Sequence, residues 1–394
     1  MSQIAAQAVS LEIAGRLILD AVSLNSGPSR FTGIIGPNGV GKSTLLRIMA
    51  GLLAPTRGEA LLNGRPVAAM SARALAREVA YLPQETQIDF AFPAWEVVMM
   101  GRHPHLGRFS LEGPRDEEAV RRAMDLTSTA HLAEQPVTTL SGGERQMTFL
   151  AKTLAQEPNV LLLDEPISAL DLNHQLRALN LVRALCREGM AAVAVLHDLN
   201  LAARYCDELV LLARGRVLAM GSPREVLTPA NLREAYGVTA MVRVDPLTGC
   251  PHVVAFDDPG EPPEDRRFHV LAGGGTAGPT LAQLFRRGAG VTVGPVEERD
   301  PDALLAQALG LPVLTYPSFH HVPDGVLQEA AEWLDRADLI LAAPVPLGPV
   351  NAALERLLKG RRVLPVGPRP QTQALVLTDL LPQKPADLEH ILAS

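Results

Sequence analysis

Residues 36–44 read GPNGVGKST and match the pattern G-x-x-x-x-G-K-[ST] of phosphate-binding loops. The apolar run FTGII precedes the loop at residues 31–35, and the helical run TLLRIMAGLL continues it at residues 44–53, so a strand and a helix flank the motif. Glycines at this spacing let backbone N–H groups turn inward around phosphate oxygens, and the helix start adds a favourable dipole. We therefore predict that nucleotide phosphates are bound by Gly36, Pro37, Asn38, Gly39, Val40, Gly41, Lys42, Ser43 and Thr44.

Two carboxylates follow a second strand that the sequence predicts to be buried. Residues 160–166 read VLLLDEP, in which four apolar residues are followed by Asp164 and Glu165. Neighbouring side chains of a strand point to opposite faces, so the two acids are expected to have different roles. We expect Asp164 to hold Mg²⁺ through water, with the Ser43 hydroxyl completing the shell, and Glu165 to polarise the attacking water as general base. Lys42 then supplies a positive charge to the phosphates.

A second phosphate-binding helix start is predicted at residues 140–146, which read LSGGERQ. Ser141 is a residue type that caps helix N-termini, and Gly142 and Gly143 expose backbone donors. One ATP molecule does not need two such cradles from the same subunit. We therefore expect Ser141, Gly142 and Gly143 to contact the ATP held by a symmetry mate, in a two-fold dimer with two shared sites.

The segments GPNGVGKST, LSGGE and LLLDEP occur in the order and at the distances found in ATP-binding-cassette (ABC) ATPases, and the chain resembles this family over about residues 5–245. Further matches are AYLPQE with Gln84, SALD at residues 168–171, and VLHDLN with His197. The resemblance implies binding of ATP and Mg²⁺. It also implies that Gln84 senses the metal and the γ-phosphate and reports to a partner, that His197 contacts the γ-phosphate, and that Asp171 bridges the dimer.

Taken with the acids described above, the resemblance implies a complete set of reacting residues. The expected catalytic residues are Glu165, His197 and Gln84. The expected metal-binding residues are Ser43, Gln84 and Asp164. One position departs from the family: an aromatic residue usually stacks on adenine ahead of the phosphate loop, whereas this chain has Ile13, which predicts weaker stacking, with Arg16 as an alternative partner for the base.

The class of ABC protein follows from the arrangement of the motifs. Translation-type members usually carry two cassettes and DNA-repair members insert a long coiled coil, whereas this chain has one cassette and only about 100 residues between Thr44 and Ser141, which favours a transporter subunit. Residues 90–110 and 197–228 resemble importers of iron-siderophore, haem and cobalamin complexes. That resemblance implies a homodimer on the cytoplasmic face of the membrane, bound to integral permease subunits and served indirectly by a substrate-binding protein.

A different class stays open at this stage. The chain could be a soluble ABC-type ATPase switch, regulated by a small molecule that binds the carboxy-terminal domain. For a transporter subunit, the carboxy-terminal domain also bears on the cargo. Some cobalamin-type importer ATPases carry a small extension that resembles this domain, which favours a corrinoid over an iron chelate. The surface around residues 90–110 is predicted to separate the two classes, because only a transporter subunit should bind a permease there.

The order of predicted elements indicates an α/β fold with two domains. Residues 1–245 are predicted to form the P-loop NTPase domain, with a helical insert over about Glu117 to Gln156. Residues 246–266 are rich in Pro, Asp and Glu and are predicted to begin with a strand fragment and continue as a linker. In residues 267–394, five apolar strand patterns alternate with helical patterns, which predicts a second, smaller doubly wound domain.

The second domain begins with a glycine pattern whose role the sequence leaves open. Gly273, Gly275 and Gly278 follow the first predicted strand in the register G-x-G-x-x-G, and Glu297 ends the next strand, where a ribose-binding acid lies in dinucleotide folds. Either a bound nucleotide or a tight, purely structural turn fits this pattern. The pair His103 and His105 lacks a carboxylate or cysteine partner, which disfavours a metal site there.

Composition excludes several function classes. The 36 Lys and Arg against 43 Asp and Glu give a net charge of −7, so no global basic field is present to hold nucleic acid. The three cysteines lack CxxC spacing, which disfavours disulfides and zinc and favours the cytosol. The first 15 residues have no signal-peptide pattern, and no run of 18 apolar residues occurs, so a membrane role is expected to be peripheral.

Overall fold

The computed structural model describes residues 2–84, 90–107, 111–168, 170–256, 266–367 and 375–382. By their contacts, the residues divide into two compact units. The first unit combines residues 1–237 with 242–253, and the second combines 238–241 with 254–394. Within the described ranges, every helix is too short or too polar to span a bilayer.

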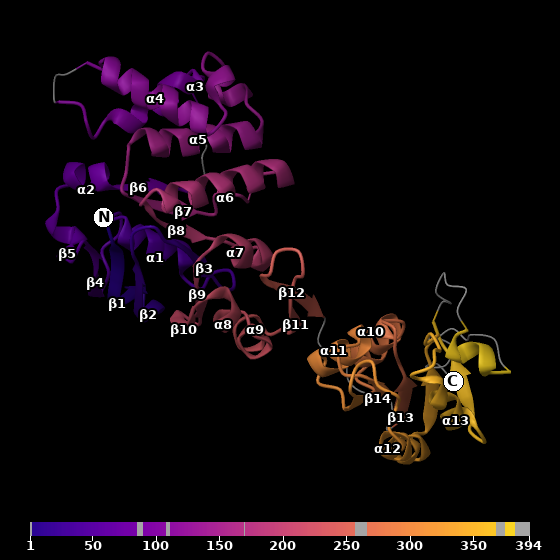
Figure 1. Cartoon of the computed structure of the whole chain (residues 1–394). Coiled ribbons are helices and arrows are strands. Elements are labelled where there is room, and N and C mark those ends of the chain that lie inside the picture. Colours follow the sequence, from indigo (N-terminus) through magenta and orange to yellow (C-terminus); the bar gives the residue numbers. More distant parts are fainter. Residues whose placement is uncertain are drawn as a thin grey trace. The chain divides into compact units, whose positions relative to one another are not determined.

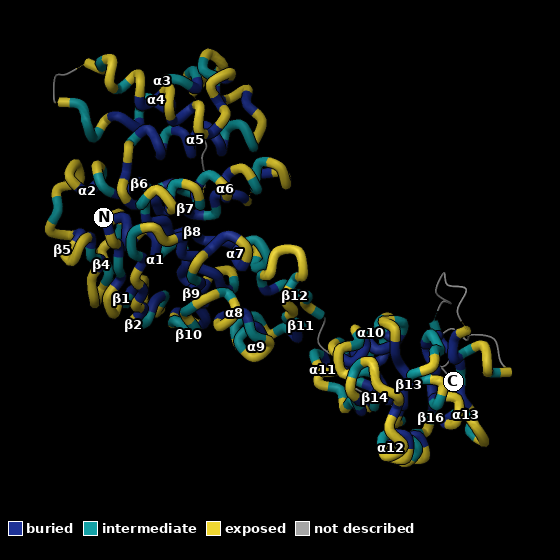
Figure 2. The backbone as a smooth tube through the Cα atoms, viewed as in Figure 1, coloured by how far each residue is buried: buried dark blue, intermediate teal, exposed yellow. Residues whose placement is uncertain are grey.

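A six-stranded sheet forms the centre of the first unit. In spatial order its strands are β10 (Arg216–Gly221), β9 (Glu208–Ala213), β3 (Phe31–Ile35), β8 (Ala191–Val195), β7 (Val160–Asp164) and β6 (Val79–Leu82). The strands from β9 to β6 are parallel, and β10 pairs antiparallel with β9. β3, β7 and β8 are buried along their whole length (Figure 2), which explains their continuous apolar sequences. Their carboxyl ends therefore meet at one edge, where polar residues follow.

A four-stranded antiparallel sheet completes the strands of this unit. In spatial order it contains β2 (Arg16–Ser26), β1 (Ile4–Ile13), β4 (Arg57–Leu62) and β5 (Arg65–Pro66). Buried residues of β1, β2 and β4 share one apolar cluster with α1 and with β3, β7 and β8. This cluster fixes the start of α1 against both sheets, and with it the phosphate loop.

The first unit also contains nine helices in its described residues. They are α1 (Lys42–Met49), α2 (Ala72–Glu78), α3 (Ala94–Met99), α4 (Pro114–Leu126), α5 (Gly142–Ala155), α6 (Leu172–Arg187), α7 (Leu199–Tyr205), α8 (Pro223–Val226) and α9 (Pro229–Tyr236). Short 3-10 turns are η1 (Val67–Ala69), η2 (Met100–Arg102), η3 (Ala130–Leu132) and η4 (Val137–Thr139). α3, α4 and α5 lie together as a helical insert (Figure 1).

The helical insert begins earlier than the sequence indicates. Its first helix starts at Ala94, whereas the helical pattern was expected only from about Glu117. α3 has six residues, which is too few for the 3.6-residue periodicity to be recognised. Its residues Val97 and Val98 are fully buried.

A small two-stranded sheet, β11 (Thr239–Val244) and β12 (Pro251–Phe256), follows the first unit's helices. β12 lies inside residues 246–266, where a strand fragment and a linker were expected. Residues 257–265, which belong to the predicted linker, lie outside the described residues. The domain limits at residues 245 and 267 stay a prediction.

The second unit contains a five-stranded parallel sheet. In spatial order its strands are β15 (Val313–Tyr316), β14 (Gly290–Glu297), β13 (Arg267–Leu271), β16 (Leu339–Ala342) and β17 (Val363–Pro365). Its helices and turns are α10 (Gly278–Arg286), α11 (Pro301–Ala308), α12 (Asp324–Asp335), η5 (Ala352–Leu354), α13 (Glu355–Leu358) and η6 (Leu377–Leu380). With the strands counted from β13, the order is 3-2-1-4-5, which is the doubly wound arrangement that the sequence predicts.

A histidine is fully buried in the sheet of the second unit. His269 of β13 is 0% exposed, and its ring nitrogens lie 2.8 Å from the Thr292 hydroxyl and 2.8 Å from the Gly294 carbonyl oxygen. Its ring meets Trp333 of α12 edge-on, with 6.3 Å between centroids. Burial lowers the pKa of His269 from 6.5 to about 4, so the ring is neutral at pH 7.

We expect His269 to destabilise the fold in mild acid. Because its pKa is lower in the folded state, the unfolded chain binds a proton first as pH falls below about 6.5, and the free energy of unfolding decreases until the folded pKa near 4 is reached. Between pH 7.5 and 5 the loss is about 2 kcal/mol. Urea unfolding of wild type and His269→Gln at both pH values, followed by Trp333 fluorescence in a Trp95→Phe background, measures it. Equal pH dependence of the two proteins would contradict the assignment.

Candidate functional site

The phosphate loop connects β3 to α1 through backbone conformations that require glycine. Gly36 has φ 147°, and a Cβ added there would lie 2.3 Å from the Leu212 carbonyl oxygen. Gly41 has φ 103°, and a Cβ there would lie 2.6 Å from the Leu19 side chain. The loop is therefore held close to β9 and β2 because two of its residues lack side chains.

The lysine of the loop is buried and faces backbone oxygens. Lys42 is 5% exposed, and its Nζ donates hydrogen bonds of 2.8 Å to the carbonyl oxygens of Gly36 and Pro37. Burial lowers the pKa of Lys42, while the negative charges of Glu165 and Asp164 raise it. The ammonium group is therefore held at the loop by two backbone oxygens, and the carboxylates of Glu165 and Asp164 stabilise its charge.

The loop serine and the strand-end aspartate are in direct contact. The Ser43 hydroxyl donates a 2.7 Å hydrogen bond to Oδ1 of Asp164, which is 0% exposed at the end of β7. The hydroxyl of Tyr81, on the neighbouring strand β6, donates a 3.0 Å hydrogen bond to Oδ2 of the same carboxylate. Burial raises the pKa of Tyr81, so it stays a donor at neutral pH. The two oxygens of Asp164 are therefore oriented from opposite sides.

Glu165 and His197 meet across the ends of β7 and β8. Oε1 of Glu165 lies 2.6 Å from Nε2 of His197. Glu165 has φ 52°, in the left-handed region that non-glycine residues rarely adopt. Strain of this kind is concentrated at functional sites, in agreement with the place of Glu165 in the lining of a cavity.

A cavity of about 740 Å³ opens above the loop, within the usual range for small-molecule sites. Most of its lining was predicted from the sequence: Asn38, Gly39, Gly41, Lys42, Ser43, Thr44, Gln84, Glu165 and His197. Two further lining residues, Ile18 and Ser168, were missed. Ile18 comes from the hairpin that also contains Ile13; Ile13 itself is 52% exposed and does not contribute to the described lining.

The lining does not include every residue that was predicted to bind ATP: it lacks Gly36, Pro37, Val40, Ser141, Gly142, Gly143 and Asp171. Ser141 caps α5, accepting a 3.3 Å hydrogen bond from the Glu144 N–H, and its own hydroxyl donates to the Glu144 carboxylate at 2.7 Å. Asp171 caps α6 by accepting a 2.9 Å hydrogen bond from the His174 N–H. A Cβ on Gly143 would lie 3.6 Å from His174, so the two helix starts are neighbours.

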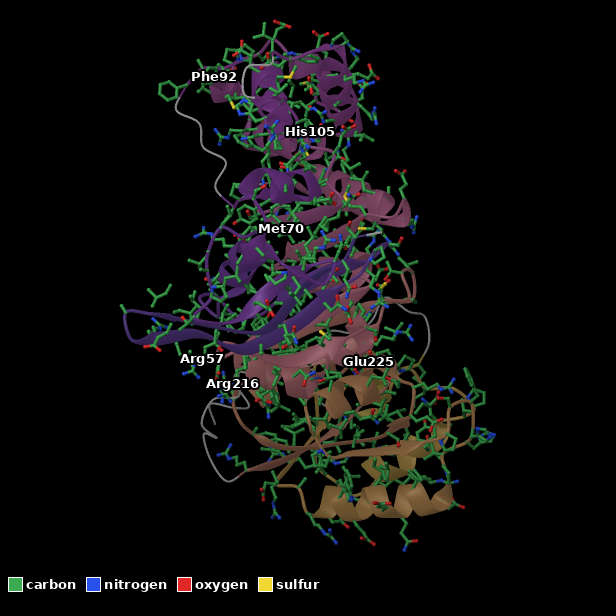
Figure 3. The ribbon with its side chains drawn as sticks, turned by 90° about the vertical axis from the view of Figure 1, so that its left-hand side faces the viewer. Arg57, Met70, Phe92, His105, Arg216 and Glu225 are labelled. Carbon is green, nitrogen blue, oxygen red and sulfur yellow. The ribbon has the colours of Figure 1, made fainter. Side chains whose placement is uncertain are left out.

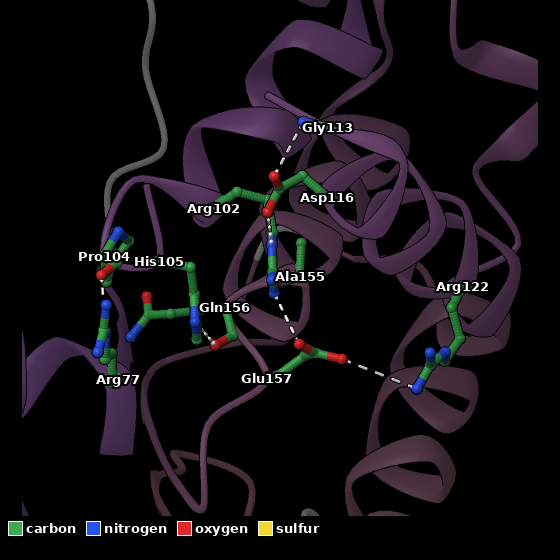
Figure 4. A network of polar contacts seen from close by, with 10 residues as sticks. All are labelled: Arg77, Arg102, Pro104, His105, Gly113, Asp116, Arg122, Ala155, Gln156 and Glu157. Atoms are coloured by element: carbon green, nitrogen blue, oxygen red, sulfur yellow. Dashed lines mark hydrogen bonds and ion pairs between the residues drawn. The ribbon is translucent and has the colours of Figure 1, made fainter. Parts of the chain in front are cut away.

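A buried arginine joins the helical insert to the loops around it. Arg102 is 5% exposed and donates 3.0 Å to Asp116, 2.7 Å to the Ala155 carbonyl oxygen and 2.9 Å to Glu157 (Figure 4). Desolvation raises the pKa of Asp116, but hydrogen bonds from the Gly113 N–H and from Arg102 outweigh it and lower that pKa. Arg102 therefore has a structural role, because acceptors on α4, on α5 and in the loop after α5 surround its charge.

The described residues contain no group of three or more His, Cys, Asp and Glu side chains that could hold a metal. His105 contacts the Gln156 carbonyl oxygen through its Nε2 at 2.9 Å (Figure 4). The three cysteines are free thiols, and burial raises the pKa of Cys186 to about 12, as expected for an unreactive residue.

In the glycine-rich turn of the second unit, backbone N–H groups donate hydrogen bonds to carboxylates of the same chain. The N–H groups of Gly273 and Ala277 donate to the buried Asp302 carboxylate at 2.9 Å and 3.1 Å. The N–H of Gly274 donates to Asp300 at 2.6 Å, and that of Gly275 donates at 3.3 Å to the same carboxylate. A nucleotide phosphate would need the same N–H donors. Its negative charge would also be repelled by the carboxylates of Asp300 and Asp302. The geometry therefore favours the structural reading of this turn.

The fold and the cavity define a P-loop nucleoside triphosphatase. A family model described as ABC transporter matches residues 19–168, and one described as the MJ0874 family matches residues 291–375. The cobalamin import ATP-binding protein BtuD of Halobacterium salinarum is 45% identical over 353 residues, covering 89% of this chain and 87% of its own length. This chain belongs to the family of ABC transporter ATP-binding proteins, and it binds and hydrolyses ATP.

Other relatives match the first unit. The hemin import ATP-binding protein HmuV of Gloeobacter violaceus is 45% identical and covers 63% of this chain, which spans 92% of its length. The ferric enterobactin transport protein FepC of Escherichia coli is 44% identical over 57% of this chain and 83% of its own. An inward-facing metal-chelate type ABC transporter structure has a TM-score of 0.57 at 26% identity, covering 65% of this chain and 98% of the other.

Proposed function

We propose that this chain drives the import of a metal chelate through a membrane permease by hydrolysing ATP, with cobalamin as the cargo. The observation that carries hydrolysis is the convergence of the phosphate loop, the Ser43–Asp164 contact and the Glu165–His197 contact at one cavity. The cargo is supported by the cobalamin import protein, because its similarity covers 89% of this chain, whereas the hemin and enterobactin proteins cover 63% and 57%.

The donor set fits Mg²⁺. Ser43 and Asp164 offer oxygen atoms, which hard divalent cations prefer, and Gln84 adds an amide oxygen at the cavity. When bound there, Mg²⁺ neutralises charge that develops on the phosphates. We assign Ser43, Asp164 and Gln84 to hold it, Asp164 through water.

The remaining roles follow from position. Lys42 attracts the phosphates, exchanging the two carbonyl oxygens that it now contacts for phosphate oxygens. Glu165 takes a proton from the attacking water, and His197, 2.6 Å away, orients that carboxylate and reaches the γ-phosphate. Ser141, Gly142, Gly143 and Asp171 serve the ATP of a second copy, which is supported by their place outside the described cavity lining.

A dimer and a permease complete the proposed assembly. A dimeric structure of the bacterial ABC transporter cassette MJ0796 has a TM-score of 0.51 at 26% identity, covering 56% of this chain and 99% of the other. Phe90 and Phe92 are 70% and 37% exposed with ring centroids 6.2 Å apart, and Phe92 lies at the periphery of the helical insert (Figure 3). An exposed pair of aromatic rings is suited to contact a permease, which this chain would bind at the cytoplasmic face of the membrane.

Tyr81→Phe should raise the Mg²⁺ concentration needed for half-maximal ATP hydrolysis about threefold to tenfold, because Oδ2 of Asp164 loses its donor and the carboxylate is free to turn. kcat at saturating Mg²⁺ should change little. Mg²⁺ titration of ATPase activity measures both values, and Mg²⁺-dependent protection of the ATP-bound protein against heating gives a readout independent of turnover. An unchanged Mg²⁺ requirement would remove Tyr81 from this role.

The cargo is tested by uptake. Cells lacking this protein, complemented with wild type or with Glu165→Gln, receive labelled cobalamin or a labelled ferric siderophore. Restoration of cobalamin uptake by wild type alone is the expected result. Restoration of siderophore uptake alone would overturn the cargo, and restoration of neither, with active purified protein, would favour a soluble ATPase switch regulated through the second unit.

A further inference from the structure

The second unit contains a cavity at the edge of its sheet opposite the glycine turn. The cavity measures about 540 Å³ and is lined by the first residues of β13 and β14, by the residues before β15 and by the end of α12. In a parallel sheet these strand starts share one edge, whereas the turn at Gly273 follows the carboxyl end of β13. The cavity is therefore separate from the turn that resembles a nucleotide motif.

The lining of this cavity is largely apolar. Phe268, Val291 and Leu311 belong to the lining, and Trp333 of α12 contributes an aromatic residue. Gly290 leaves space in the wall, because a Cβ added there meets no atom nearer than 3.7 Å. A volume of this size and an aromatic wall suit a ligand with a flat apolar body.

Thr292 is a lining residue of the cavity, and its hydroxyl oxygen can accept a hydrogen bond. The Gly294 carbonyl oxygen can only accept, so Nε2 of the neutral His269 ring carries the proton and donates to it at 2.8 Å. Nδ1 is then an acceptor, and the Thr292 hydroxyl donates to it at 2.8 Å, with the Phe268 carbonyl oxygen as a second acceptor at 3.3 Å. Thr292 lines the cavity, and its oxygen keeps lone pairs for a donor on the ligand.

The charges at the cavity are positive. Arg267 and Arg336 line it, and no acidic side chain does so among the described residues. Each arginine has an acidic neighbour outside the lining, Asp338 at 3.7 Å and Glu332 at 3.6 Å, but these are long, exposed ion pairs that cost little to exchange. Two guanidinium groups beside an apolar cavity are complementary to one anionic group on an apolar ligand.

We propose that this cavity binds a small aromatic organic anion, with its ring system against Trp333 and its anionic group on Arg267 and Arg336. The site makes the second unit a ligand-binding domain. This inference goes beyond the proposed transport function and does not depend on it.

The full-length protein offers a direct optical test. The chain has two tryptophans, so in a Trp95→Phe background Trp333 alone reports on the cavity. We use the aromatic sulfonate 1-anilinonaphthalene-8-sulfonate as probe and its uncharged analogue N-phenyl-1-naphthylamine as reference. The sulfonate should quench Trp333 saturably at one site and bind at least tenfold more tightly than the analogue. Equal affinities would overturn the role of the arginines.

Variants distinguish probe binding at this cavity from non-specific binding to apolar surface elsewhere on the protein. Arg336 is exposed, so Arg336→Gln should fold normally and weaken sulfonate binding about fivefold while leaving the uncharged analogue unchanged. Gly290→Leu should fill the cavity and remove binding of both probes, whereas Gly325→Leu, at a glycine where an added Cβ meets no atom within 4 Å, should bind like wild type. Wild-type binding by both Arg336→Gln and Gly290→Leu would refute the site.

Discussion

Replacing Glu165 with glutamine should lower kcat for ATP hydrolysis at least 100-fold while ATP still binds. The change removes the carboxylate that takes a proton from water, and general-base catalysis of this kind contributes about 10² to 10⁴ in rate. The amide retains the size of the side chain and its place beside His197, 2.6 Å away. Steady-state ATPase rates and equilibrium binding of a fluorescent ATP analogue measure the two effects.

The same variant tests the proposed dimer. Because ATP is bound and not consumed, two copies should remain associated around two nucleotides, and size-exclusion chromatography should detect a dimer only with ATP and Mg²⁺. Glu188→Gln changes an exposed acid at the end of α6 in the same way and should behave as wild type. Hydrolysis at the wild-type rate in Glu165→Gln would rule out Glu165 as the base.

Lys42→Met should weaken ATP binding about 10- to 100-fold. The substitution retains the aliphatic stem but removes the ammonium group, and a charge-assisted hydrogen bond to phosphate is worth about 1.5 to 3 kcal/mol. The carbonyl oxygens of Gly36 and Pro37 also lose their donor. Isothermal titration with a non-hydrolysable ATP analogue gives the affinity.

An exposed lysine provides the matched comparison for this variant. Lys359→Met, after α13 in the second unit, should bind the analogue with wild-type affinity. Circular dichroism of both variants shows whether the fold is retained. If folded Lys42→Met bound the analogue as tightly as wild type, the charge of Lys42 would have no part in phosphate binding.

The phosphate site was predictable because its information is local in the sequence. Nine consecutive residues, with a strand before them and a helix after them, define the loop, and the structure places that loop at a cavity. The alternation of apolar runs was equally sufficient for the second unit, whose five strands appear in the doubly wound order. In both cases short-range patterns carry the signal.

The residues that sequence reasoning missed depend on contacts between distant segments. Tyr81 reaches Asp164 only because β6 pairs with β7, and Ile18 lines the cavity only because the hairpin of β1 and β2 packs near the loop. No local motif marks either residue. Short helices were difficult for a different reason: α3, η5 and α13 have six, three and four residues, lengths at which periodicity is not defined.

The turn at Gly273 to Gly275 has a consequence for competition between anions. Asp300 and Asp302 belong to the same chain as the N–H groups they occupy, so their effective concentration at the turn does not fall when the solution is diluted. Even a short flexible tether gives effective concentrations on the order of millimolar, and a folded turn holds its partners more closely. A free phosphate compound would have to displace this internal competitor, so supplying more nucleotide to the cell should leave the turn unchanged.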